Sequence, residues 1–313
     1  MIKRIFAVLF ILLAVGCARP ASIPTESGLI SIRLPVGYIP NVQFAPLYVA
    51  LEKGYFREEG LDVQLDYSME TDGVALVGAG TLPFSVASGE QVLLGRAQGL
   101  PVVSILAWYQ RYPVGVTAPA TLDLRSPSEL RGRKIGLPGL YGANYIGLRA
   151  LLEAGGLKES DVTLESIGFN QVEALMSGRV DAVSIYTPNE PVQLEAKGMP
   201  VLTLSAADYL PLVGNGLITN ETVAREQPDL ARKMARAVLR GMQAALEDPN
   251  AAYTTCQAYV AGLAQADATV QRAVLAASMK LWQAPKLGYS EPSSWQNMQS
   301  ILLKMGLLKA PLD

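Results

Sequence analysis

Aromatic and amide side chains able to hold a flat ring follow a predicted strand near the start of this 313-residue chain. Tyr38, Asn41 and Gln43 lie directly after an alternating apolar run over residues 30–36. An aromatic face can stack on a ring while neutral amides bond to the polar edge of that ring. The alternative is that Tyr38 and Phe44 are only core residues at a strand end, since ordinary strand-to-helix loops look much the same.

The neighbouring elements place this loop at the edge of a sheet. Apolar residues at helical spacing over 47–56 predict a helix, and alternation over 61–66 predicts a second strand. The helix should end at Gly54 or Gly60, because a left-handed cap costs glycine little. The segment therefore forms a βαβ unit, whose loop lies at the carboxyl edge where open α/β sheets bind ligands.

A second group of aromatic residues follows the predicted strand over 102–108. Trp108 and Tyr109 stand at its end, beside further polar and aromatic residues. Such rings can stack on a flat ligand or fill an interface between domains. We name both as candidate ligand contacts.

A glycine-rich loop over 137–145 contributes Tyr141, Asn144 and Tyr145 between a predicted strand and the predicted helix 146–157. Glycines let the backbone approach a ligand closely, and the following helix start offers unpaired N–H groups. An anion cradle or a plain tight turn is the alternative, but no acidic residue completes a dinucleotide fingerprint. The loop has no Lys or Arg, which favours an uncharged aromatic ligand.

The strongest polar candidates follow the predicted strand 183–186. Tyr186, Asn189 and Glu190 stand at its end. An amide and a carboxylate together can bind ring N–H groups, an aminopyrimidine or ribityl hydroxyls. The alternative is structural, with Asn189 capping a helix whose dipole favours Glu190.

The first residues predict export. Residues 1–16 combine two basic residues with an apolar run over 5–15, which is typical of a signal peptide and too short to span a membrane. Small residues precede Cys17, which indicates cleavage before it and lipid attachment to its thiol; ordinary secretion with an incidental cysteine is the alternative. Residues 17–28 then form a tether, and two acyl chains on Cys17 would anchor it stably.

Composition excludes several classes of function. The chain contains no histidine, which removes Ser-His-Asp and Cys-His nucleophiles and histidine zinc sites. Neither a phosphate-binding loop nor paired metal-binding cysteines occur, so we predict no catalytic residue, metal or cofactor. A net charge of −2 without long charge runs argues against nucleic acid as a partner. Cys256 is expected to be a buried apolar residue.

Several phrases of the chain resemble one family of transport proteins. Gly-Tyr-Ile-Pro-Asn-Val-Gln-Phe-Ala-Pro-Leu-Tyr-Val-Ala at 37–50 precedes Gly-Tyr-Phe at 54–56 and Glu-Gly-Leu-Asp-Val at 59–63. Glu-Ala-Leu-x-x-Gly-x-Val-Asp-Ala follows at 173–182. These motifs resemble those of the solute-binding proteins of importers for riboflavin and the thiamine pyrimidine precursor. More distant members of the group bind taurine, alkanesulfonates and nitrate. The resemblance covers nearly the whole mature chain.

The resemblance implies the type II periplasmic-binding-protein fold, with two α/β lobes and a ligand cleft between them. Crossings near residues 113 and 214 would give lobe I as 29–113 with 214–313, and lobe II as 114–213. The family also implies a turn at Ser85 and Ser88 whose N–H groups face the ligand, although helix capping alone would explain Ser88.

The implied function is extracytoplasmic capture of a small aromatic heterocycle by a lipid-anchored monomer, followed by delivery to a permease with an ATPase subunit. Riboflavin is the leading ligand, because the candidate residues are aromatics and neutral amides. A formylamino- or hydroxymethyl-pyrimidine is the alternative, and a sulfonate or nitrate is less favoured. The resemblance also extends to pyrimidine synthases, which share this fold and depend on histidine. Because this chain has no histidine, we predict that it is not an enzyme.

Overall fold

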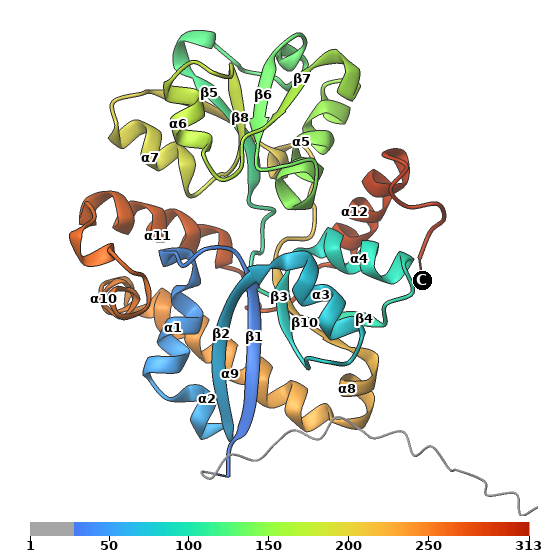
Figure 1. The fold of residues 1–313 in the computed structure, drawn as a ribbon, viewed down its shortest axis with the longest axis vertical. Helices are drawn as coiled ribbons and strands as arrows, with labels where there is room; N and C mark the ends of the chain where they lie inside the picture. The colour runs from blue at the N-terminus through green and yellow to red at the C-terminus, as the bar shows by residue number, and fades with distance from the viewer. Residues whose placement is uncertain (1–27, 313) are drawn as a thin grey trace, which may run out of the picture.

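The computed structural model describes residues 28–312, which form two α/β lobes, one above the other in Figure 1. The predicted signal over 1–16, Cys17 and all but the last residue of the predicted tether over 17–28 lie outside the described residues. Within residues 28–312, no helix is both long and apolar enough to cross a membrane.

The strands form three sheets. β1 and β2 pair alone, β3, β10 and β4 form a second sheet in that order, and the third has the order β7-β6-β8-β5-β9. The strands are β1 (Ile30–Gly37), β2 (Leu61–Met69), β3 (Ser85–Ala87), β4 (Val102–Ala107), β5 (Val114–Pro119), β6 (Lys134–Leu137), β7 (Thr163–Ser166), β8 (Ala182–Tyr186), β9 (Val201–Ser205) and β10 (Gly216–Asn220).

Helices cover these sheets in both lobes (Figure 1). The α-helices are α1 (Ala45–Glu52), α2 (Tyr55–Glu58), α3 (Glu70–Gly78), α4 (Gly89–Ala97), α5 (Gly142–Ala154), α6 (Gln171–Met176), α7 (Glu190–Ala196), α8 (Glu221–Glu226), α9 (Pro228–Glu247), α10 (Pro249–Tyr259), α11 (Ala268–Trp282) and α12 (Pro292–Lys304). The 3₁₀ turns used below are η1 (Val42–Phe44) and η6 (Leu263–Gln265).

The βαβ unit predicted from the first strand onward is confirmed. β1 and β2 are parallel, with Ile30 opposite Leu61. Gly54 has a φ of 73° between α1 and α2, which is the left-handed conformation that glycine adopts at low cost. The loop that follows β1 therefore lies at the carboxyl edge of this pair.

Helix α9 packs closely behind α1. A Cβ atom at Gly241 would run into the carbonyl oxygen of Pro46, so only glycine permits this approach. Met234, Val238 and Met242 of α9 are buried in the same core as α1. The position of α1, and hence of the loop before it, depends on this contact.

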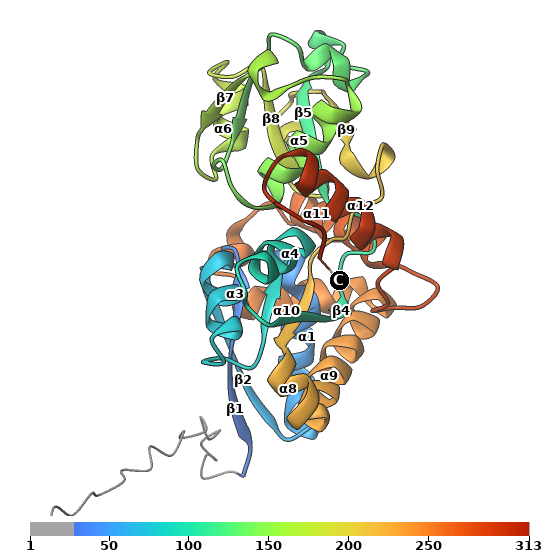
Figure 2. The same cartoon turned by 90° about the vertical axis from the view of Figure 1, so that its right-hand side faces the viewer.

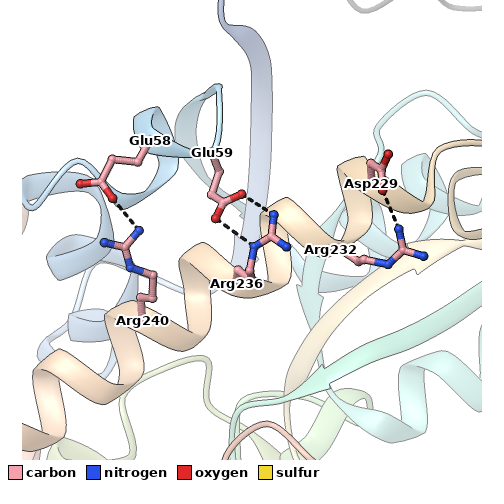
Figure 3. Close-up of polar contacts among 6 residues, drawn as sticks. All are labelled: Glu58, Glu59, Asp229, Arg232, Arg236 and Arg240. Atoms are coloured by element: carbon pink, nitrogen blue, oxygen red, sulfur yellow. Dashed lines mark hydrogen bonds and ion pairs between the residues drawn. The ribbon is translucent and has the colours of Figure 1, made fainter.

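Ion pairs line the outer side of α9 (Figure 3). Arg236 forks onto Glu59 with N–O distances of 2.9 and 2.7 Å, and Arg240 Nη1 lies 2.6 Å from Glu58 Oε2. The arginines are exposed to solvent, so each pair stabilises the fold by about 1 kcal/mol or less. The buried face of α9 therefore contributes more than this row of charges.

Two segments cross between the lobes, one before β5 and one before β10. The N–H groups of Trp108 and Tyr109 both donate to the carbonyl oxygen of Asn215, at 2.9 and 3.0 Å. Gly214 allows this contact, because a Cβ there would lie 2.8 Å from the Tyr109 carbonyl oxygen. The crossings thus run side by side behind the space between the lobes. Lobe limits at 113/114 and 213/214 remain our proposal.

The last helix links the two lobes (Figure 2). Met298 and Leu302 of α12 are buried in one cluster with Leu137 of β6 and Leu151 of α5. Lys304 Nζ also lies 2.8 Å from a carboxylate oxygen of Glu153. The C-terminal segment therefore packs on the core of the upper lobe.

Candidate functional site

A pocket lies between the two lobes, at the loop edges of their sheets. Residues of both lobes line it, and small-molecule sites commonly occur at such boundaries between domains. Its walls carry nine residues predicted from the sequence: Tyr38, Gln43, Trp108, Tyr109, Tyr141, Asn144, Tyr186, Asn189 and Glu190. We call this space the ring pocket.

Aromatic side chains from both lobes meet around the ring pocket. Phe44 and Trp108 pack edge to face at a ring separation of 6.1 Å, deep in the lower lobe. Tyr109 meets Tyr186 of the upper lobe at 6.4 Å and also accepts a hydrogen bond of 3.2 Å from the amide of Gln43. These contacts hold several ring edges in fixed positions around an apolar space.

A second aromatic pair joins the lobes at the mouth of the pocket. The rings of Tyr38 and Phe169 lie 5.1 Å apart at an interplanar angle of 79°. Tyr38 comes from the loop after β1, and Phe169 from the loop after β7. This pair therefore forms only when the lobes are close together.

Two amides in the pocket lack partners. Asn144 Nδ2 is buried and has no hydrogen-bond partner among the described residues. The side chain of Gln171 is only 4% exposed, and no hydrogen bond to it occurs within residues 28–312. A buried unpaired donor destabilises a protein by about 1–3 kcal/mol, so a ligand that accepts from Asn144 would recover that free energy.

Glu190 is a buried carboxyl group held by its neighbours. Its two oxygens accept from the backbone N–H of Tyr186 at 2.9 Å and from Asn189 Nδ2 at 3.1 Å. Burial raises the pKa of Glu190 to about 7. The side chain of Asn189 does not cap helix α7; its oxygen accepts from Gln193 Nε2 at 2.9 Å instead.

A second carboxyl group of the pocket belongs to a buried chain of hydrogen bonds. Ser88 Oγ lies 2.6 Å from a carboxyl oxygen of Glu70 and also contacts a carboxyl oxygen of Glu90. One hydroxyl hydrogen cannot serve two carboxylates, so one carboxyl must be protonated and donate to Ser88. The Ser88 N–H also donates to Glu70, which leaves Glu90 as the protonated member.

The pKa shifts of the two glutamates agree with a protonated Glu90. Burial, followed by repulsion from Glu70, raises the pKa of Glu90 to about 8. Burial also raises the pKa of Glu70, against the hydrogen bonds from Ser88 that lower it. Glu70 lines the ring pocket, whereas Glu90 lies behind it. The pocket thus presents the carboxyls of Glu70 and Glu190, and no Lys or Arg of residues 28–312 lines it.

Three predicted residues lie outside the ring pocket, and each has a structural role. Asn41 caps η1 through a 3.0 Å bond from the Gln43 N–H. Ser88 is occupied by the two glutamates, and its neighbour Ser85 donates to the Pro35 carbonyl oxygen. The Tyr145 hydroxyl lies 2.6 Å from Glu159 and 2.7 Å from Arg149, on the side of α5 away from the pocket lining.

Among the lining residues that the sequence did not single out as ligand contacts, five carry an aromatic, amide or carboxyl side chain: Phe44, Glu70, Phe169, Gln171 and Asn215. Glu70 directly follows β2, and Phe169 and Gln171 follow β7. The rule that ligands bind at the carboxyl ends of parallel strands would have found these three positions. Within residues 28–312, no three His, Cys, Asp or Glu side chains come together in a way that could hold a metal ion.

Curated relatives cover most of the chain. The riboflavin-binding protein RibY of Chloroflexus aurantiacus is 39% identical over 98% of this chain and 93% of its own length. The formylaminopyrimidine-binding protein of Halalkalibacterium halodurans is 32% identical over 80% of this chain and 76% of its own. A yeast 4-amino-5-hydroxymethyl-2-methylpyrimidine phosphate synthase, THI13 of Saccharomyces cerevisiae, is 27% identical over 67% of this chain and 65% of its own length.

Among solved structures, the periplasmic aliphatic sulphonate binding protein SsuA from Escherichia coli superposes with a TM-score of 0.73. It is 13% identical, and the match covers 90% of this chain and 95% of that one, so the likeness concerns the fold. The profile of the family described as NMT1/THI5 like matches residues 41–252. The chain therefore has the periplasmic-binding-protein fold and belongs to the NMT1/THI5-like family.

Proposed function

We propose that this protein captures riboflavin outside the cytoplasm and delivers it to a membrane permease powered by an ATPase. The observation that carries the proposal is the ring pocket, which combines aromatic side chains and neutral amides from both lobes with no cationic side chain. The isoalloxazine ring of riboflavin is flat, largely apolar on its faces and edged by hydrogen-bonding atoms. The similarity to RibY over nearly the whole chain supports the same ligand.

The charge of the lining argues against a small anion. Sulfonate or nitrate needs a cation or several free N–H donors, because an ionised group loses its hydration on burial. The ring pocket instead presents Glu70 and Glu190. A neutral ligand meets no such repulsion.

A pyrimidine precursor is the second candidate, favoured by the position of Glu190. A carboxylate can accept from the exocyclic amine of an aminopyrimidine, and a protonated carboxyl can donate to a ring nitrogen. The formylaminopyrimidine-binding relative supports this candidate. Against it, the lower identity and shorter coverage of that relative favour the ligand of RibY.

We infer a binding role rather than catalysis. The chain has no histidine, and the synthase relative matches it at only 27% identity. We also propose attachment to the outer face of the cell membrane through lipid on Cys17, with the protein acting as a monomer. Mass spectrometry of the cellular protein, compared with Cys17→Ser, tests the anchor: diacylglycerol mass on Cys17 supports it, and an unmodified residue contradicts it.

The ligand is tested by titrating the purified protein into riboflavin while following flavin fluorescence. Stacking against aromatic residues should quench the emission, and quenching should saturate at one riboflavin per chain with submicromolar affinity. Glu190→Ala should weaken binding, whereas Tyr145→Phe, outside the pocket lining, should not. If the emission stays unchanged at protein concentrations up to about tens of micromolar, any binding is weaker than that concentration and riboflavin is rejected as the ligand.

A further inference from the structure

We propose that a groove next to the ring pocket binds a neutral polyhydroxylated tail and rejects a phosphorylated one. This inference rests on the proposed function, since it names the part of the ligand beyond the ring. The groove runs from the loop after β1, past α6 and α7, to η6 and the start of α11. We call it the tail groove.

The tail groove continues the ring pocket. Both are lined by Tyr38, Phe169, Gln171, Asn189 and Glu190. The edge-to-face pair of Tyr38 and Phe169 therefore stands at the junction of the two spaces. A ligand whose ring fills the ring pocket would pass any side chain between these rings into the groove.

Amide side chains provide the polar wall of the tail groove, and several have unused hydrogen-bonding atoms. Gln171 is 4% exposed, and neither its side chain nor that of the half-buried Gln271 has a hydrogen-bond partner within residues 28–312. In the same described range, Asn41 uses only its oxygen and Gln193 only its Nε2. The tail groove is thus lined by both free donors and free acceptors.

This mixture matches hydroxyl groups. Each hydroxyl donates one hydrogen bond and accepts others. An amide side chain can accept through its oxygen and donate through its nitrogen. An apolar tail would displace water from the amide of Gln171 without giving it a new partner, which is unfavourable. The wall therefore suits a chain of hydroxyl groups such as a ribityl tail.

The charges of the tail groove disfavour phosphate. Glu173 and Glu190 line it, and no lysine or arginine does so. A phosphate would lose hydration here without gaining a cation, and it would face carboxylates. The groove should therefore distinguish a free sugar-alcohol tail from its phosphate ester.

Three flavins with one ring system test the proposal on the unaltered protein. Fluorescence titrations at pH 8 compare lumiflavin, which has the ring without the tail, with riboflavin and riboflavin 5′-phosphate. We expect riboflavin to bind about tenfold more tightly than either, since two hydrogen bonds of ordinary strength give such a factor. Equal affinity for lumiflavin and riboflavin, or for riboflavin and its phosphate, would overturn the inference and leave the proposed function standing.

Matched variants then locate the effect. Gln271→Leu removes an amide of the tail groove, and Gln265→Leu is its control, because Gln265 is exposed in η6 and does not line the groove. We expect Gln271→Leu to weaken riboflavin about fivefold and leave lumiflavin within twofold, with Gln265→Leu changing neither. Equal losses for both flavins would contradict the assignment. Failure of all three flavins to bind would reject the proposed function itself.

Discussion

Asn144 illustrates how a single side chain can be placed for a ligand rather than for the fold. Its backbone carbonyl accepts from Ser184 Oγ at 2.8 Å, so the residue is anchored through its main chain. Its amide nitrogen, by contrast, is buried in the ring pocket wall without a partner among the described residues. The amide nitrogen therefore gains no hydrogen bond from the fold and remains available to bind.

Replacing Asn144 by leucine separates binding from stability. We expect Asn144→Leu to weaken riboflavin about tenfold and to leave the midpoint of thermal unfolding unchanged or raised, because an unpaired buried donor disappears. Fluorescence titration and thermal unfolding measure the two quantities. Tyr145→Phe is the control, since that hydroxyl bonds Glu159 and Arg149. Unaltered affinity in Asn144→Leu would show that the amide does not touch the ligand.

The buried carboxyl groups make stability depend on pH. Glu90 and Glu190 have pKa values of about 8 and about 7 in the folded chain, against 4.5 ordinarily. Between pH 5 and pH 8 the folded state thus holds more protons than the unfolded state, and stability must fall as pH rises. We expect a loss on the order of a few kcal/mol across that range, measured by denaturant unfolding.

Glu90→Gln should flatten this dependence, because an amide can donate to Ser88 at every pH. Glu59→Gln is the matched control: Glu59 pairs with Arg236, which lowers its pKa, so the fall between pH 5 and pH 8 should persist. A wild-type stability that rises from pH 5 to pH 8 would contradict the protonated state assigned to Glu90.

The sequence predicted which types of residue line the pocket better than it predicted the role of each residue. Ser88 follows a strand as the predicted ligand contacts do, yet two buried glutamates occupy its hydroxyl. Tyr145 lies one residue from Asn144, but the helical turn directs it to the opposite side, toward Arg149. Periodicity predicts which element a residue is on, whereas its partners come from distant segments.

Among the elements, α9 determines where the loop after β1 lies. Gly241 allows α9 to touch the backbone of α1 at Pro46, and α1 directly follows η1 with its pocket residues. The sequence does not indicate that α1 is the partner of α9, because a glycine within a helical pattern does not reveal what it contacts.

Gly241→Ala should therefore destabilise the fold. The new methyl group would force α1 and α9 apart, and we expect a loss of about 1–3 kcal/mol in the free energy of unfolding, measured in urea. Gln243→Ala, an exposed position of the same helix, should change stability by less than about 0.5 kcal/mol. Arg236→Ala, which breaks an exposed ion pair, should cost less than about 1 kcal/mol. A harmless Gly241→Ala would show that the helices can separate freely.

For the whole molecule, the arrangement suggests binding by closure of two lobes. The lobes meet through Tyr38 and Phe169 at the mouth, and through Tyr186 and Asn215 within the pocket, where the hydroxyl donates over 3.3 Å. The two-lobe architecture was predicted through the family resemblance. The cross-lobe contacts were not, because each joins residues that are distant in sequence and meet only when the lobes close.

Phe169→Ala should loosen the closed form. Removing one ring of an aromatic pair weakens the contact by about 0.5–1.5 kcal/mol, so riboflavin should dissociate roughly two- to tenfold faster while association changes little. Stopped-flow fluorescence measures both rates. Leu140→Ala is the control, because Leu140 is exposed on the glycine-rich loop but does not line the ring pocket. An unchanged dissociation rate would indicate that the pair does not hold the lobes together around the ligand.

The pocket between the lobes should bind riboflavin in preference to a pyrimidine. Calorimetric titration of the purified protein with riboflavin and, separately, with formylaminopyrimidine measures this preference. We predict submicromolar binding of one riboflavin per chain, and binding of the pyrimidine at least about a hundredfold weaker, a difference of roughly 2.7 kcal/mol. Tight binding of the pyrimidine with no heat from riboflavin would contradict the claim.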